Sequence, residues 1–246
     1  MAKSSGLGDN FYVAGYDVSG DIGSINLSGG PATLDVTGID KSAHERIGGL
    51  RTGAMSWTAF FNPAIGATHD QFSSLPRTDV ICTYMRGTTL GNPAAAQVSK
   101  QINYDGTRGN SGEFTFAIEA QCNGFGLEWG QQLTAGKRVD TAATNGTGID
   151  TTASAAFGAQ AYLQAFAFTG TDVTVKIQDS ADNVSFADVT GLAFTQITAG
   201  PASERIATAS GATVRRYLRA VTVTTGGFSS LTFAVVLVKN ATAVSF

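Results

Sequence analysis

Short segments in which apolar and polar residues alternate at period two constrain the fold of this chain most. Over residues 54–61 one face carries Met55, Trp57, Ala59 and Phe61, and Ser56 and Thr58 occupy the other. This pattern predicts half-buried β-strands. Similar strands are expected at residues 79–86, 113–121, 172–178 and 230–239. The last of these is apolar on both faces, so we expect both to be covered.

Turn residues separate these segments, and helical patterns are scarce. Turns are expected at residues 104–106, 108–112, 169–171 and 225–227, which are rich in Gly, Asn and Asp. A short helix is expected at 68–75, with Thr68 or Asp70 as its N-cap and Pro76 ending it. Residues 94–100 could form one helical turn. The fold class is therefore all-β with minor α.

Residues 134–157 show no apolar period and are rich in Ala, Thr and Gly, which is typical of a linker. We therefore expect one domain at 1–145 and a second at 146–246. Within the second, strands are expected at residues 162–168, 173–177, 186–189, 194–197, 216–223 and 231–238. That density of strands predicts a compact antiparallel β-sandwich.

Charge is scarce, at 14% of residues with a net charge of −3, and there are 30 glycines. Low charge suits a protein that covers much of its surface with copies of itself, although a genome rich in small residues would give the same composition. The sequence lacks the basic stripe that is typical of a DNA-binding surface. It also has no apolar run long enough for a membrane span. The N-terminus lacks an apolar export segment, so we expect cytoplasmic synthesis, with Cys82 and Cys122 reduced and buried.

We find no cluster of residues that predicts catalysis or metal binding. The two histidines, His44 and His69, lack nearby ligands at zinc spacing. Cys82 lies in an apolar strand and is interpreted as a packing residue. Glu113, Glu119 and Glu128 are candidates for a glycosidase pair, but Glu113 and Glu119 would stand about 20 Å apart along a strand.

Two further segments leave alternatives open. Residues 178–183 contain side chains that could bind calcium, but they fail the EF-hand spacing and are interpreted first as a hairpin turn. Arg215, Arg216 and Arg219 form a basic cluster on one predicted strand. This cluster is interpreted as a salt-bridged strand edge, with a contact to another subunit, a glycan or a nucleic acid as alternatives.

The first part of the chain resembles the tail tube (major tail) proteins of long-tailed, non-contractile bacteriophages, the siphophage type. The resemblance lies in the order of pieces between residues 9 and 135. These pieces are an extended segment at 11–22, a strand ending Leu-Asp-Val-Thr at 34–37, a polar loop at 38–50, an aromatic strand at 53–62, a helix near 69–75, and a strand at 114–121 leading into 124–130.

The resemblance implies a structural virion protein without catalytic residues or a cofactor. Six copies would form a ring, rings would stack into a tail tube, and double-stranded DNA would pass through the channel during delivery to the host. Glu113, Thr115 and Glu119 are then candidate lumen residues. The loop at 38–52 becomes the candidate contact between subunits or rings, with Asp40, Lys41, His44, Glu45, Arg46 and Arg51 as its residues. Residues 146–246 exceed the minimal tube subunit and would form an extra β-sandwich that decorates the tail.

Other functions share the same strand pattern. The chain could be another virion component, such as a capsid decoration or tail-tip protein. A carbohydrate-binding β-sandwich module is a further alternative, with Tyr162, Phe186 or Tyr217 as exposed aromatic residues that stack on sugars. Enzymatic activity is the least favoured function, because the sequence contains no cluster of residues that predicts catalysis.

Overall fold

The computed structural model describes residues 5–243, and it is almost entirely β-structure with antiparallel strand pairing. The strands of its first half are β1 (Asn10–Val13), β2 (Tyr16–Asp17), β3 (Ile22–Asp35), β4 (Arg46–Phe60), β5 (Val80–Met85), β6 (Pro93–Gln101), β7 (Asp105–Arg108), β8 (Phe114–Cys122) and β9 (Glu128–Gln132). The second half contains β10 (Arg138–Asp140), β11 (Ile149–Asp150), β12 (Ala159–Gly170), β13 (Thr174–Ser180), β14 (Ala187–Ala193), β15 (Ala202–Ala207), β16 (Tyr217–Val223) and β17 (Phe228–Lys239). The all-β prediction is confirmed.

Within residues 5–243, helical structure is limited to α1 (Thr68–Phe72) and one 3-10 turn at Ser19–Asp21. The predicted helix at 68–75 is therefore present but shorter. The suggested helical turn at 94–100 is wrong, because these residues form β6 at the centre of a sheet. Small, fully buried side chains such as Ala94 and Ala96 allow neighbouring layers to pack closely on this strand, which overrides their helical preference.

One thirteen-stranded sheet runs through both halves of the chain, along the path β15-β12-β17-β9-β6-β5-β1-β2. A branch leaves β6 through β8, which pairs with β4 and β7, and β4 pairs with β3. A separate four-stranded sheet has the order β11-β16-β13-β14. The predicted strand at 194–197 is absent, since only an isolated bridge joins Val173 to Ile197.

Three groups of buried apolar side chains hold these layers together. The first group lies within residues 11–120 and includes Phe11, Met55 and Trp57. The second lies within residues 133–237, between the second-half strands of the large sheet and the four-stranded sheet. A third group joins the halves, because Tyr12 and Tyr162 both belong to it. β17 is covered on both faces, as predicted from its apolar sequence. The division into domains at 1–145 and 146–246 stays a prediction.

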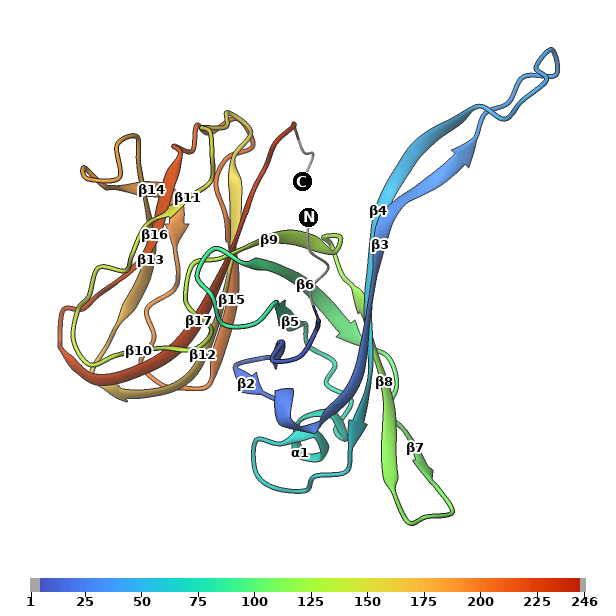
Figure 1. Cartoon of the computed structure of the whole chain (residues 1–246), viewed down its shortest axis with the longest axis horizontal. Coiled ribbons are helices and arrows are strands. Elements are labelled where there is room, and N and C mark those ends of the chain that lie inside the picture. Colours follow the sequence, from blue (N-terminus) through green and yellow to red (C-terminus); the bar gives the residue numbers. More distant parts are fainter. Residues whose placement is uncertain (1–4, 244–246) are drawn as a thin grey trace.

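Two hairpins extend from this body in opposite directions. Figure 1 shows β3 and β4 as a long twisted ribbon that reaches far beyond the rest of the chain, and β7 and β8 as a shorter hairpin at the other end. We name residues 28–52 the arm. Almost all of its side chains are exposed, so cross-strand pairing rather than packing maintains it.

Candidate assembly surface

Three adjacent strands and a short fourth form a sheet whose outer face is polar and exposed. In register, Asn26 of β3 lies opposite Ser56 of β4, and Ser56 lies opposite Glu119 of β8. The neighbouring row joins Ser24, Thr58 and Ala117, and β7 adds Asp105 beside Ala117. We name the following residues the polar face: Ser24, Asn26, Ser28, Thr52, Ala54, Ser56, Thr58, Asp105, Thr107, Thr115, Ala117, Glu119 and Gln121. The exposed ring of Phe60 lies at its end, opposite Thr115.

The pleat of the sheet separates this face from the core. Met55, Trp57 and Ala59 of β4 are buried, and Phe116 and Ile118 of β8 are buried beside them. Residues between them point to the opposite side, because successive side chains of a strand alternate. The named positions of the polar face therefore contain two carboxylates, Glu119 and Asp105, and no lysine or arginine. Lys100 of β6 lies opposite Gln121 at the border of the face, and its ammonium group pairs with Asp79 at 2.8 Å.

The edges of this sheet are open within the part of the chain that the structure describes. β3 pairs only with β4, and β7 pairs only with β8. β3 is 14 residues long and carries no charged residue before Asp35. A long uncharged edge is a template for pairing with another strand, and isolated proteins usually protect such edges with lysine, proline or a bulge. Two register shifts interrupt the pairing of β3 with β4, one between Ile22 and Ser24 and one beside Pro31, and the residues between them form an uninterrupted ladder.

The tip of the arm is organised by its own polar contacts. Residues 36–45 connect β3 to β4, and the amide of Val36 donates a hydrogen bond to the carbonyl of Glu45 at 3.0 Å. His44 Nδ1 lies 2.9 Å from an Asp35 carboxylate oxygen. Lys41 lies 3.5 Å from Glu45 and 3.9 Å from Asp40. These pairs are exposed and therefore contribute little to stability, but they give the tip a defined shape.

Apolar side chains on the arm remain largely exposed in the single chain. Ile39 at the tip and Leu50 on β4 are almost fully exposed, and Leu34, Val36 and Ile47 are about half exposed. Such a concentration of exposed apolar side chains on one projection marks an interaction surface.

The predicted loop at 38–52 needs correction, because only its first part is a loop. Arg46 begins β4 and lies directly opposite Asp35, and Arg51 lies further along the same strand opposite Pro31. Both residues belong to β4 because they pair with β3. This Gly-rich segment lacks the alternation of apolar and polar residues that would predict a strand. Asp40, Lys41, His44 and Glu45 do come together at the tip, whereas Arg51 lies at the base of the arm.

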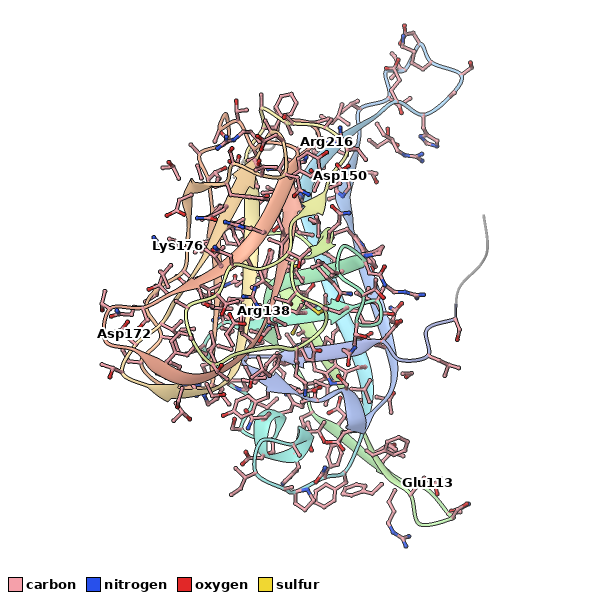
Figure 2. The ribbon with its side chains drawn as sticks, turned by 60° about the vertical axis from the view of Figure 1, so that its left-hand side comes forward. Glu113, Arg138, Asp150, Asp172, Lys176 and Arg216 are labelled. Atoms are coloured by element: carbon pink, nitrogen blue, oxygen red, sulfur yellow. The ribbon has the colours of Figure 1, made fainter. Side chains whose placement is uncertain are left out.

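The three candidate lumen residues lie in two different places. Thr115 and Glu119 lie on the polar face, and the Gln121 amide donates to Glu119 at 3.0 Å. Glu113 precedes β8 and lies at the turn of the β7–β8 hairpin, at the opposite end of the molecule from the tip of the arm (Figure 2). The predicted turn at 108–112 is confirmed by the Gly109 amide, which donates to the Glu113 carbonyl at 2.8 Å. The turn expected at 104–106 is wrong, because β7 begins at Asp105.

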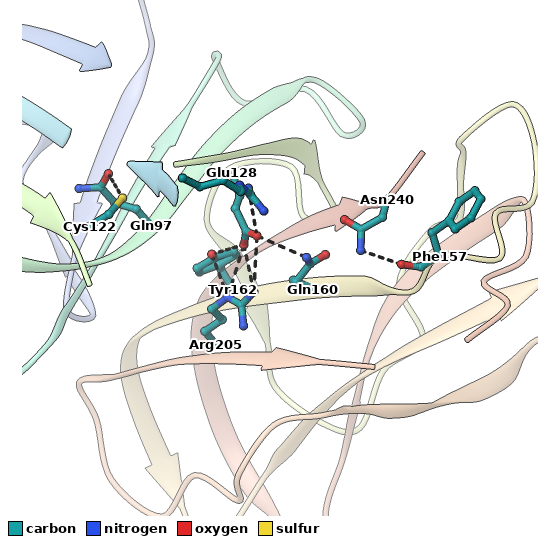
Figure 3. Close-up of polar contacts among 9 residues, drawn as sticks. Gln97, Cys122, Glu128, Phe157, Gln160, Tyr162, Arg205 and Asn240 are labelled. Carbon is teal, nitrogen blue, oxygen red and sulfur yellow. Dashed lines mark hydrogen bonds and ion pairs between the residues drawn. The ribbon is translucent and has the colours of Figure 1, made fainter. Parts of the chain in front are cut away.

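Sequence reasoning missed a buried polar network at the base of the arm. Glu128 of β9 is 3% exposed, and its carboxylate lies 3.3 Å from Arg205 of β15 and 3.7 Å from Arg51 of β4. The Tyr162 hydroxyl donates to the same carboxylate, and the Gln160 amide donates at 3.3 Å (Figure 3). The network thus connects the arm to both halves of the chain. No local sequence signal indicates these partners, because they come from distant strands.

Burial and the Glu128 charge raise the pKa of Tyr162 above its usual range, so this hydroxyl stays a donor to the carboxylate. The ring of Phe125 stacks beneath the Arg205 guanidinium, 3.6 Å from ring centre to Cζ. Tyr162 is only 1% exposed, so the suggestion that it stacks on sugars is wrong. Phe186 and Tyr217 are partly covered by the guanidinium groups of Arg219 and Arg216.

The other segments with possible chemistry have structural partners. Arg215 pairs with Asp179 at 2.7 Å, Arg216 with Asp150 at 2.6 Å, and Arg219 donates to Gln178, as expected for a salt-bridged strand. Figure 2 shows Arg216 and Asp150 together at one end of the second half. Asp182 accepts the backbone amides of Val184 and Ser185, which agrees with the hairpin-turn interpretation of 178–183.

The cysteines are free, and burial raises the pKa of Cys82 to about 12 and that of Cys122 to about 11. Such thiols are poor nucleophiles at neutral pH. Within residues 5–243, no group of three or more His, Cys, Asp or Glu side chains could hold a metal ion. The same part of the chain contains no helix long and apolar enough to cross a membrane.

No family model matches the chain, and no curated protein matches it. Among solved structures it is similar to the tail of an empty gene transfer agent particle, at 16% identity and a TM-score of 0.36, over 44% of this chain and 80% of that one. The chain is also similar to a structure from the virion of a native gene transfer agent particle, at 14% identity and a TM-score of 0.41, over 52% of this chain and 98% of that one.

The Dit (gp 19.1) protein of phage SPP1, described as a hub of the adsorption apparatus, gives 13% identity and a TM-score of 0.31, over 92% of this chain and 98% of that one. All three are components of tails, virions or an adsorption hub. Their TM-scores lie below 0.5, so they assign neither a family nor a function to this chain.

Proposed function

We propose that this chain is a structural protein of a phage-type tail, in which six copies form a ring, rings stack into a tube, and double-stranded DNA passes through the channel. The polar face carries this proposal. It is a wide, exposed sheet surface with two carboxylates, bounded by the open edges of β3 and β7. The cation that borders it, Lys100, lies opposite Gln121 and is paired with Asp79. A channel for DNA needs a lining that does not bind phosphates, and this face meets that requirement.

In this proposal the ring closes by pairing between the open strand edges of neighbouring copies. The β3 edge of one copy would pair with the β7–β8 side of the next, so that six sheets join into one barrel lined by the polar face. Backbone pairing between copies would satisfy the amides and carbonyls of β3 that lack a partner in the single chain. Such contacts are heterologous, and they close into a ring when the rotation between neighbouring copies divides a full turn.

Stacking of the rings is assigned to the arm. Its exposed aliphatic residues, Ile39 and Leu50 among them, would pack against the neighbouring ring, and the polar tip would set the register. The second half of the chain, anchored beside the arm by the Glu128 network, would lie outside the tube. In the assembled particle the protein would contact other tail proteins and DNA only in transit.

Negative-stain microscopy and sedimentation of the purified full chain test the proposal. The expected result is tubes, or stacked rings, with a central hole. Single rings that never stack would favour a tail-tip protein in place of a tube subunit. A monodisperse monomer at high concentration, in a protein that is also absent from purified virions, would reject both.

A further inference from the structure

An open cleft lies where the two halves of the chain meet, and none of the surfaces described so far includes it. Its volume is about 640 Å³, and its walls come from β9, the end of β17 and residues 151–157. Pockets of a few hundred cubic ångströms that combine apolar walls with a few polar groups are the usual sites for small ligands.

Two aromatic rings give this cleft its character. Trp129 of β9 is 53% exposed, and Phe157 is 36% exposed, although large aromatic side chains are usually buried when nothing binds them. β9 alternates so that Glu128 enters the buried network while Trp129 points to the outer side. The exposed indole is therefore fixed by a strand whose other face is locked in the core.

Amide groups of fixed orientation lie beside the rings. The Asn240 side chain donates to the Phe157 carbonyl at 2.9 Å, and Figure 3 shows the Phe157 ring pointing away from that amide. The Gln131 side chain donates to the Gly91 carbonyl at 3.2 Å. Both side chains line the cleft and keep a carbonyl oxygen that can accept a hydrogen bond from a hydroxyl.

The charged groups at the cleft are engaged within the chain. Lys239, its one cation, bonds to the Thr151 hydroxyl and the Ala153 carbonyl, and desolvation lowers its pKa. The nearby Asp150 carboxylate is held by Arg216. The wall at 151–157 is itself fixed, since the Thr152 amide donates to Asp150 at 2.8 Å and Thr152 adopts a φ of 71°, which is rare for a β-branched residue.

We infer that this cleft binds a neutral oligosaccharide, with Trp129 as the stacking platform, Phe157 as the facing wall, and Gln131 and Asn240 as hydrogen-bond acceptors for sugar hydroxyls. A sugar ring presents an apolar face of C–H groups to an aromatic ring and hydroxyls around its rim. A cleft with aromatic walls and amide acceptors, whose one cation is bonded within the chain, matches both features. The inference does not depend on tube assembly.

The two tryptophans make the test selective, because Trp57 is 3% exposed and Trp129 is 53% exposed. Acrylamide quenching of fluorescence therefore reports mainly on Trp129. The probes are cellotetraose, chitotetraose and maltotetraose, each titrated to about 10 mM so that millimolar dissociation constants are detected. At least one should protect Trp129 from quenching and give a calorimetric binding isotherm.

Variants then locate the binding. Trp129→Ala should weaken calorimetric affinity about tenfold or more, and Trp129→Phe, which keeps a ring, should weaken it less. Phe60→Ala removes a ring that is equally exposed, at 53%, but lies outside the cleft, and it should bind like the unaltered chain. Thermal melting of each variant establishes that it is folded.

Two results would overturn the inference. One is failure of all three sugars to bind. If Trp129→Ala also blocks assembly in that case, the cleft is a contact between copies. The other is binding that Trp129→Ala leaves unchanged. Sedimentation reads assembly independently, so failure of sugar binding is distinguishable from failure of the proposed tube.

Discussion

The carboxylate of Glu128 lies 3.3 Å from the guanidinium of Arg205, and both side chains are almost completely buried although they belong to different halves of the chain. Arg51 approaches the same carboxylate from the base of the arm. One ion pair therefore lies where the polar sheet, the arm and the second half meet. Changes at this point are expected to affect the whole chain rather than one surface.

Glu128→Gln should destabilise the chain by roughly 3–5 kcal/mol, because it leaves the Arg205 charge buried without its counterion. Chemical denaturation measures the free energy of unfolding. Lys41→Ala, which breaks only exposed pairs with Glu45 and Asp40, should change it by less than about 0.5 kcal/mol. The double variant Glu128→Gln, Arg205→Met should recover part of the loss. Equal stability of Glu128→Gln and the unaltered chain would show that the network is not important for folding.

Replacing residues 36–45 by Asn-Gly should abolish stacking and leave the subunit folded. Asp35 and Arg46 are directly paired, so a two-residue turn can close the shortened hairpin. The removed residues contribute no core contacts, and the cooperative melt should therefore persist. Deletion of residues 44–49 would be less suitable, because it removes paired residues of β4. Tubes that still form in microscopy would exclude the tip from the ring contact.

Ser56→Lys should make assembled tubes retain DNA. Ser56 lies at the centre of the polar face, between Asn26 and Glu119, and six copies would place a ring of cations in the channel. Fluorescence anisotropy of a short labelled duplex should rise with this variant and fall again with added salt. Val184→Lys adds the same charge at an exposed turn of the second half and should have no effect. If both variants bind the duplex equally, the polar face does not line the channel.

Asp150→Asn should reduce the loss of stability in acid. The hydrogen bond from Arg216, followed by that from the Thr152 amide, lowers the pKa of Asp150 from 3.8 to about 2. A folded-state pKa below the unfolded value means that the stabilisation is present above pH 4 and is lost as the pH falls from about 4 to about 2. The melting temperature of the unaltered chain should therefore fall more steeply in this window than that of Asp150→Asn. Asp40→Asn, at an exposed 3.9 Å pair, serves as the control and should follow the unaltered chain.

Much of the fold was predictable because it depends on local alternation. Met55 and Trp57 are buried and Ser56 and Thr58 are not, as period two requires. The α1 helix was likewise predictable in place and type. The strands of the arm were harder to predict, because residues 28–35 and 46–52 have no buried face, and a strand without one leaves no apolar alternation in the sequence.

The candidate site was predictable only in part. Thr115 and Glu119 were placed on one face by alternation, but their rows with Asn26 and Ser56 depend on strand register, which joins residues far apart in sequence. Trp129 gave no pattern that distinguishes an exposed ring from a buried one. Its exposure arises because β9 has the core on one side only.

The sequence by itself determined the half-buried strands, the helix at Thr68 and a chain poor in charge, since each depends on neighbouring residues and on composition. Only the tertiary structure decided that one sheet joins both halves, that Glu128 meets Arg205 and Arg51, and that the rows of the polar face bring Asn26, Ser56 and Glu119 together. Those features depend on which strands pair and in which register, and pairing is decided by the combined burial of distant residues.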